Sequence, residues 1–311
     1  MATPGDDPST LQFVVVGPTG AGKSALLHSF AVQYGDISLI SIDSMTIYRE
    51  FSIGTAKPTQ EERAEVPYYL VDVISIDKEY SLAQYLDDVR SAKVEIERAG
   101  RRAMFVGGTP LYYRGVVDGL VPPPQFQGLR AWLERDEDHA LSQEGRYRLL
   151  QLVDPEASHQ IEPSNARRTI RALEVALGSG GRHSVAGRPF GEHPEVPFYV
   201  IGLDLPSDLH LRRLEKRIDA QLAQGWLEEV EDLVSRGIRW SRTAGQAIGY
   251  SELREVVLGD CGIDEARDRI LSRTRRLAKR QRSWFRRDPR IRWVTDEEEG
   301  LALLWNTMAQ M

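Results

Sequence analysis

Short apolar runs rich in Val and Ile recur along the chain and alternate with longer segments of helical pattern. The six runs occupy residues 13–16, 37–42, 69–73, 103–106, 198–203 and 291–294. Runs of this length and composition are typical of strands buried on both faces. Helical spacing follows at 25–33 and at 81–99, where Ser81 and Gln84 form a capping box and Gly100 marks the end. Strands that alternate with helices predict an α/β fold, a parallel sheet with helices on both faces.

One region breaks this alternation. Residues 120–196 contain no strand-like run and begin with a cluster of prolines. Helix-like stretches occur there at 127–137, 145–153 and 166–177. We therefore predict a helical insertion domain at 120–196, within an α/β core formed by 1–119 and 197–311. Residues 263–287 of that core have the pattern of one long helix.

Composition restricts the class of protein. The chain has 311 residues, enough for a sizeable core. It has no apolar stretch of the ~18 residues that a membrane span needs, and its first ten residues lack the blocks of a signal peptide. A single cysteine, Cys261, and six histidines without ligand spacing argue against disulfides and zinc. We expect a cytoplasmic, enzyme-like protein without a membrane partner.

Positive charge is concentrated near the carboxyl end. Residues 267–292 contain twelve Arg or Lys against two Asp, a net charge of +10 in a chain whose net charge is −6. Trp284 and Phe285 interrupt the run. Charge runs are often only solvated helix faces, but a run of nearly one sign with aromatic residues indicates a polyanion such as nucleic acid.

The first strand-like run leads into a phosphate-binding loop. The stretch "GPTGAGKS" fits G-x-x-x-x-G-K-[ST] and opens a helical segment, which is the context that this motif requires. Its backbone N–H groups and helix N-terminus attract anionic oxygens, the lysine adds a point charge, and the serine hydroxyl can ligate Mg²⁺. The predicted phosphate-binding residues are Gly17, Pro18, Thr19, Gly20, Ala21, Gly22, Lys23 and Ser24.

Two further loops follow strand-like runs, and ligands of parallel sheets bind beyond these carboxyl ends. Asp43 follows the second run, where its carboxylate can act as a general base, a metal partner or a structural cap. The stretch 53–59, "IGTAKPT", is consistent with ligand contact or with a surface turn. After the fourth run, Thr109 offers a hydroxyl, or an N-cap to a helix that starts at Pro110.

Six motifs together carry a family resemblance. They are, in chain order, "GPTGAGKS", "DSMTIYREFSIGTAKPT", "FVGGTPLYYRGVVDGL", "RRTIRALEV", "QAIGYSEL" and "RLAKRQRSWFRRD". Over about residues 13 to 290 the chain resembles the tRNA dimethylallyltransferase family, also called tRNA isopentenyltransferase. It departs from the family pattern at Thr46, often glutamine, at 162–168, "EPSNARR", and at Ser283, often threonine.

The resemblance implies a P-loop NTPase-like core and transfer of the dimethylallyl group from dimethylallyl diphosphate to the exocyclic amine of an adenosine beside the anticodon. The P-loop would then hold the diphosphate leaving group, with Mg²⁺ near Ser24. Lys23 would stabilise the leaving group, Thr109 would hydrogen-bond its bridging oxygen, and Asp43 would accept a proton from the amine. The family also implies a monomer.

The same resemblance implies contacts with the anticodon stem-loop of tRNA, whose adenosine must be flipped out of the stack to react. The residues concerned are Asp43, Ser44, Met45, Thr46, Arg130, Arg167, Arg168, Thr169, Ile170, Arg171, Gln246, Arg276, Lys279 and Arg280. Thr46 would lie near the flipped base.

Two other functions remain open from the residues alone. A P-loop kinase of a nucleoside or small metabolite would use the same loop for ATP, but it does not explain the basic segment. A non-catalytic RNA-binding module would explain that segment, but it leaves the P-loop and Asp43 without a role.

Overall fold

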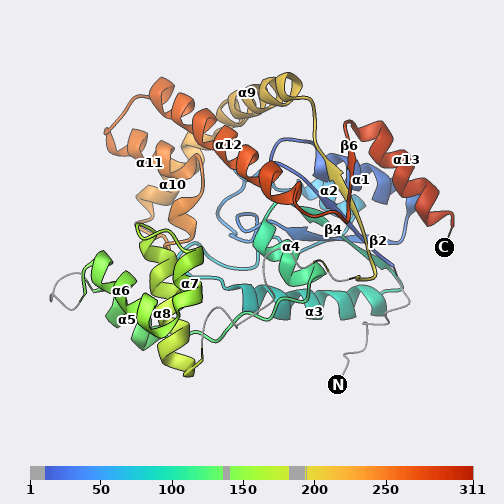
Figure 1. Ribbon diagram of the computed structural model, residues 1–311. Coiled ribbons are helices and arrows are strands. Elements are labelled where there is room, and N and C mark those ends of the chain that lie inside the picture. The colour runs from blue at the N-terminus through green and yellow to red at the C-terminus, as the bar shows by residue number, and fades with distance from the viewer. Residues whose placement is uncertain (1–10, 136–140, 182–192, 194, 311) are drawn as a thin grey trace. The chain divides into compact units, whose positions relative to one another are not determined.

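A six-stranded parallel sheet forms the centre of the computed structural model, which describes residues 11–135, 141–181, 193 and 195–310 (Figure 1). The sheet order is β3-β2-β4-β1-β5-β6. The strands are β1 (Gln12–Val16), β2 (Ile37–Ile42), β3 (Tyr68–Tyr69), β4 (Arg102–Gly107), β5 (Phe198–Leu203) and β6 (Ile291–Val294). The predicted parallel α/β fold is confirmed.

The third strand is shorter than its apolar run predicts. The sequence suggested residues 69–73, whereas β3 covers only Tyr68 and Tyr69. Leu70 and Asp72 both have left-handed φ, 59° and 60°, which is incompatible with an extended strand. The carboxylate of Asp72 binds Lys57 and Arg63, each at 2.6 Å, so this segment is shaped by ion pairs rather than by sheet pairing.

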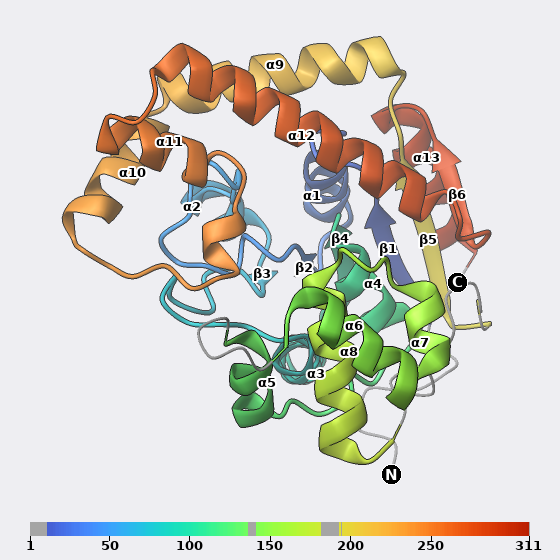
Figure 2. The same ribbon diagram turned by 60° about the vertical axis from the view of Figure 1, so that its left-hand side comes forward.

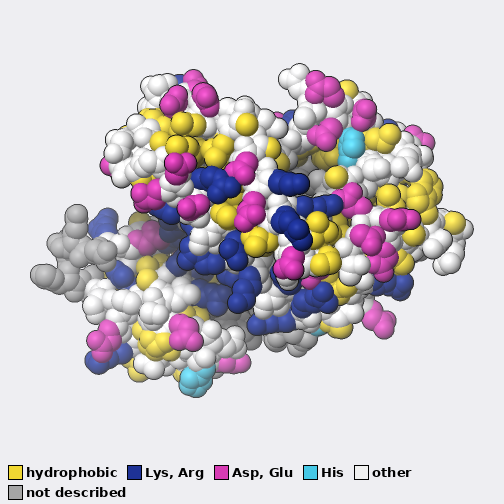
Figure 3. Space-filling model, turned by 90° about the horizontal axis from the view of Figure 1, so that it is seen from above, with side chains coloured by type: hydrophobic (Ala, Val, Ile, Leu, Met, Phe, Trp, Pro, Cys, Tyr) yellow, Lys and Arg dark blue, Asp and Glu magenta, His cyan; other side chains and the backbone are white. Residues whose placement is uncertain are grey.

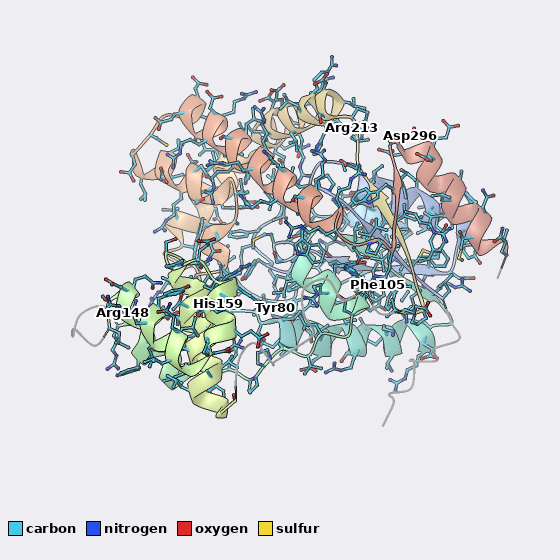
Figure 4. All side chains as sticks on the ribbon, in the orientation of Figure 1. Tyr80, Phe105, Arg148, His159, Arg213 and Asp296 are labelled. Atoms are coloured by element: carbon cyan, nitrogen blue, oxygen red, sulfur yellow. The ribbon has the colours of Figure 1, made fainter. Side chains whose placement is uncertain are left out.

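Alternate residues of the strands face two cores. One face packs against α1 (Lys23–Tyr34) and α13 (Glu297–Met308), and the other packs against α3 (Leu82–Arg98) and α4 (Pro110–Val117) (Figure 1). Phe105, labelled on β4 in Figure 4, lies fully buried in the second core. The capping box predicted at Ser81 and Gln84 is present at the start of α3.

A further helical layer extends the same unit. It comprises α9 (Ser207–Ala223), α10 (Trp226–Ser235), the 3-10 turn η2 (Ala244–Gln246), α11 (Tyr250–Leu258) and α12 (Ile263–Phe285). The short helix α2 (Gln60–Glu65), between β2 and β3 in the chain, buries none of its residues. Helices α9 and α12 lie side by side (Figures 1 and 2). Ile270 of α12 packs in the core formed by these helices, and Phe285 packs on the sheet. The predicted long helix therefore connects two hydrophobic cores.

The chain divides into two compact units. One consists of Met1–Asp118 and His193–Met311, and the other of Gly119–Glu192, close to the boundaries predicted at 119/120 and 196/197. The described part of the second unit has four helices, α5 (Gln127–Glu134), α6 (Gln143–Val153), α7 (Pro155–Gln160) and α8 (Ala166–Ser179). They share a small core around Leu150 and Leu173. Among the described residues, no helix is long and apolar enough to cross a membrane.

Candidate active site

Two cavities open at the carboxyl ends of the central strands, both lined by the larger unit. The P-loop cavity, about 400 Å³, is lined by Lys23, Ser24 and neighbouring loop residues. The outer cavity, about 600 Å³, extends toward α11 and α12. Both volumes lie in the range of ligand sites, about 300–1,000 Å³. The residues that line both cavities are Thr19, Asp43, Thr55, Gly108, Arg217 and Gln281.

The P-loop connects β1 to α1 and takes a backbone path that its glycines permit. Gly17 and Gly22 have φ values of 144° and 103°, which L side chains rarely adopt. A Cβ at Gly17 would lie 2.3 Å from the carbonyl oxygen of Leu203 in β5, so any larger residue would displace the loop. Gly22 is the N-cap of α1, and the N–H groups of the first helical turn point toward an anion site. This backbone path is the one that a phosphate-binding loop requires, and phosphate binding by these residues stays a prediction.

Lys23 is almost buried at the base of the P-loop cavity. Its Nζ donates to the carbonyl oxygen of Pro18 (2.7 Å). Burial lowers the pKa of Lys23 to about 8, an effect that nearby Arg217 strengthens and that Asp43 only partly offsets. A buried ammonium of this kind favours an incoming anion, because the anion restores the charge balance that burial removes.

Helix α9 supplies an arginine that the sequence did not single out. Arg217 lines both cavities, and burial lowers its pKa although the Asp43 carboxylate raises it. One turn earlier, Arg213, labelled in Figure 4, donates to the carbonyl oxygen of Ala21 (3.3 Å) and pairs with Glu297 (3.1 Å). Only the packing of α9 over the P-loop identifies Arg217 as a site residue, since its spacing in the chain carries no signal.

Asp43 caps a turn, one of the roles that its sequence position allowed, and it also lines both cavities. Its Oδ1 accepts from the N–H of Met45 (2.8 Å) and of Thr46 (3.4 Å), so it caps the turn after β2. The same side chain lines both cavities, between Lys23 and Arg217. Turn capping therefore orients the carboxylate at the cavity junction rather than removing it from the site.

The hydroxyls of Thr109 and Thr46, two predicted site residues, both make hydrogen bonds within the protein. Thr109 is the N-cap of α4, but its hydroxyl makes no cap; it accepts from the N–H of Ser44 (3.1 Å) and contacts Ser44 Oγ (3.4 Å). Thr46, predicted near the flipped base, lines the P-loop cavity and is only 8% exposed, and its hydroxyl is paired with Ser41 Oγ (3.0 Å).

The sequence left two interpretations of the loop 53–59 open, ligand contact and a structural turn, and different residues of the loop match each. Lys57 is structural, since its Nζ binds the Asp72 carboxylate (2.6 Å) and the carbonyl oxygens of Tyr48 and Arg49. Thr55 lines both cavities, so the loop also contributes to the ligand site.

The outer cavity has an apolar wall and a basic rim. Ile218, Trp226, Ile248 and Tyr250 are among the apolar and aromatic residues that line it. The rim includes the predicted tRNA contacts Gln246, Arg276 and Arg280, together with Arg273. A flat, partly apolar ligand that is joined to an anionic chain would match this distribution of side chains.

The basic residues of α12 and its flank divide into paired and unpaired groups. Toward the start, Arg267, Arg269 and Arg273 pair with Asp219, Glu255 and Glu252. Toward the end, Arg282 and Arg286 pair with Asp204. Among the described residues, four exposed cations in the middle have no carboxylate within ion-pair distance, namely Arg275, Arg276, Lys279 and Arg280. Lys and Arg side chains gather in the middle of the face seen in Figure 3.

In the smaller unit, the predicted tRNA contacts are not equally exposed. Arg167 and Arg168 are exposed on the first turn of α8, and Arg130 pairs with Glu134 (3.0 Å). Arg171 donates to the carbonyl oxygen of Pro123 (2.7 Å) and pairs with the buried Glu174 (2.9 Å).

The structure contradicts two of these predicted tRNA contacts. Thr169 is fully buried, and Ile170 is 8% exposed and packs in the core of the smaller unit. The five residues 167–171 cover more than one full helical turn, so a contiguous motif must place some of its members on the buried face. Thr169 and Ile170 stabilise the unit and do not present a surface to RNA.

No group of three or more acidic, histidine or cysteine side chains among the described residues could hold a metal ion alone. The donors at the P-loop cavity nevertheless suit Mg²⁺, which prefers oxygen ligands and usually shares them with substrate phosphates. The Ser24 side chain is exposed at the cavity, and the Asp43 carboxylate lines it as well.

The fold and site together define a P-loop α/β protein whose P-loop lies beside a basic helix. The sequence profile of the IPP transferase family matches residues 46–288. The tRNA dimethylallyltransferases of Kocuria rhizophila and Streptomyces coelicolor are 41% and 40% identical to the chain, covering 90% and 93% of it and 88% and 91% of their own lengths. The crystal structure of the tRNA isopentenylpyrophosphate transferase of Bacillus halodurans matches with a TM-score of 0.69 and 31% identity, over 97% and 96% of the two chains.

The chain therefore belongs to the IPP transferase family, a family of prenyl-transferring enzymes, as its sequence motifs predicted.

The lowered pKa of Lys23 predicts a pH limit on anion binding. Below about pH 8 the side chain is charged and attracts inorganic diphosphate; above it the charge is lost, and affinity should fall by about tenfold per pH unit. Titration calorimetry between pH 7 and 9.5 measures this. Lys23→Arg is the matched control, because a guanidinium stays charged over the range while diphosphate ionises equally for both proteins. A parallel decline in both proteins would show that Lys23 does not titrate in this range.

Proposed function

We propose that this protein is a tRNA dimethylallyltransferase that moves the dimethylallyl group of dimethylallyl diphosphate to the exocyclic amine of an adenosine next to the anticodon. The observation that carries the proposal is the junction of the two cavities. The P-loop cavity at Lys23 shares Asp43 and Arg217 with a partly apolar cavity that arginines also line. Donor and acceptor can therefore meet at one carboxylate. The two cavities are lined by a single chain, so a monomer completes the site.

The leaving group determines what the P-loop does in this reaction. As the allylic C–O bond breaks, the electron pair remains on the diphosphate. Lys23, Arg217 and the N–H groups at the start of α1 stabilise that growing charge more than they stabilise the ground state, which is the condition for catalysis. The Thr109 hydroxyl, whose 3.4 Å contact with Ser44 is long, is free to turn toward the bridging oxygen. The P-loop here activates an electrophile and transfers no phosphoryl group.

The amine nitrogen attacks the allylic carbon as the C–O bond breaks, and the product nitrogen must lose one proton. Asp43 accepts it: Oδ1 is held by the turn, and the carboxylate faces the cavity junction. We assign the Ser24 hydroxyl and the diphosphate oxygens as ligands of a Mg²⁺ ion, which neutralises leaving-group charge when bound.

The adenosine has to leave the anticodon stack to reach Asp43, at a cost of a few kcal/mol. The unpaired cations at the middle of α12 offset this cost by binding phosphates at the rim of the outer cavity. A tRNA substrate agrees with the cytoplasmic location expected from the single cysteine.

A P-loop kinase is the second candidate. It would share the anion site, but the four unpaired cations of α12 and the arginine rim would have no substrate to bind. The experiment that separates the two candidates is mass analysis of an anticodon stem-loop RNA after incubation with dimethylallyl diphosphate and Mg²⁺. We expect one dimethylallyl group on the adenosine; an unchanged RNA would refute the proposal.

Asp43→Asn tests the general base without removing the cap, because an asparagine carbonyl still accepts from the N–H of Met45. We expect kcat to fall by about 10²-fold or more while both substrates bind normally. Quenched-flow turnover at saturating substrates gives kcat, and thermal unfolding verifies the turn. Turnover close to the wild-type rate would leave Asp43 with a structural role only.

Charge neutralisation on α12 tests the tRNA surface. Replacing Arg276, Lys279 and Arg280 by glutamine should weaken RNA binding and flatten the plot of log affinity against log salt by about 0.7–0.9 for each lost contact. The matched control neutralises Arg267 and Arg269, which already pair with acids, and should leave the slope nearly unchanged. Equal slopes for the triple variant and the wild type would place the RNA elsewhere.

A further inference from the structure

One glutamine of α12 connects the basic helix to two catalytic loops. Gln281 follows Arg280 directly and is 8% exposed. Its Oε1 accepts from the N–H of Thr19 in the P-loop (2.8 Å), and its Nε2 donates to the carbonyl oxygen of Gly108, beside Thr109 (2.7 Å). A single side-chain amide thus uses its acceptor on one loop and its donor on the other.

The space around this amide is closely fitted. A Cβ added to Gly108 would lie 2.8 Å from Gln281 Nε2 and 3.1 Å from the carbonyl oxygen of Gly17. Gly108 therefore allows the loop after β4 to approach both α12 and the P-loop. Neither loop can shift without breaking a hydrogen bond to Gln281.

The next residue of α12 reaches the same P-loop residue by a second route. Arg282 donates to His210 Nδ1 (3.0 Å), and His210 Nε2 contacts the carbonyl oxygen of Thr19 (2.8 Å). Because Nδ1 accepts, Nε2 carries the proton and donates to Thr19. Burial lowers the pKa of His210, which keeps the ring in this neutral form. Thr19 is therefore held at its N–H by Gln281 of α12 and at its C=O by His210 of α9, which Arg282 of α12 contacts in turn.

We propose that Gln281 is a positioning residue that couples RNA binding on α12 to the geometry of the diphosphate site. Phosphates bound at Arg276, Lys279 and Arg280 restrain the helical turn that precedes Gln281. Gln281 in turn holds Thr19 and Gly108 in the arrangement that receives the diphosphate. The inference rests on the proposed transferase function. By linkage, RNA then tightens diphosphate binding by the same factor as diphosphate tightens RNA binding.

The test uses Gln281→Met, which keeps the length of the side chain and removes both hydrogen bonds. Ser283→Ala, on the exposed side of the same turn, is the matched control. The dissociation constant of inorganic diphosphate with Mg²⁺ is measured with and without a saturating anticodon stem-loop RNA. For the wild type and the control we expect RNA to lower it by at least about fivefold, the lower end of typical coupling. For Gln281→Met we expect the diphosphate dissociation constants with and without RNA to agree within about twofold. We also expect a lower kcat and an unchanged affinity for RNA.

A second variant guards against a simple folding defect. Gly108→Ala pushes against the Gln281 amide from the opposite side and should cause the same loss of coupling. Gln281→Met protein that keeps the wild-type ratio would overturn the inference, as would wild-type protein that modifies RNA without any coupling. Wild-type protein that fails to modify RNA would refute the transferase function instead.

Discussion

The site depends on an excess of positive charge that is shielded from water. Lys23 and Arg217 both interact with the carboxylate of Asp43, and burial lowers the pKa of each cation. With Arg213 and Glu62, the described residues that line the P-loop cavity have three cations against two carboxylates, which leaves one positive charge unbalanced where solvation is weak. A bound diphosphate removes this imbalance, and it does so most strongly when a C–O bond breaks and further negative charge develops. In the proposed reaction, the same charge arrangement therefore binds the diphosphate and stabilises it as the leaving group.

Helix α12 extends this use of charge to a second ligand. Acidic residues neutralise the arginines near both of its ends, but those in the middle remain available beside the outer cavity. Because, within α12, only the cations in the middle lack acidic partners in the described part of the chain, a polyanion would bind at that segment of a chain whose net charge is negative. Gln281 directly follows this segment, so the part of the helix proposed to bind RNA adjoins the residue that contacts the loops of Thr19 and Thr109.

Much of this arrangement follows from the sequence. The apolar runs predicted the sheet, the glycines and lysine predicted the P-loop, and the charge run predicted the basic helix. The third strand was wrong because apolar composition does not reveal the left-handed backbone at Leu70 and Asp72. Thr169 and Ile170 were misassigned because a motif read as consecutive letters ignores helical period. Arg217 was missed because only tertiary packing brings α9 over the P-loop. The sequence left Asp43 open as cap or base, and the structure shows the cap and a place in both cavities, while the role of base stays a proposal.

The central claim is that the P-loop serves a leaving group. Its most direct test is the stoichiometry of a single turnover, with RNA, dimethylallyl diphosphate and labelled ATP present together. The account predicts one inorganic diphosphate released for each RNA modified and no ADP formed. ADP that appears in step with the modified RNA, or RNA modification that requires ATP, would contradict it.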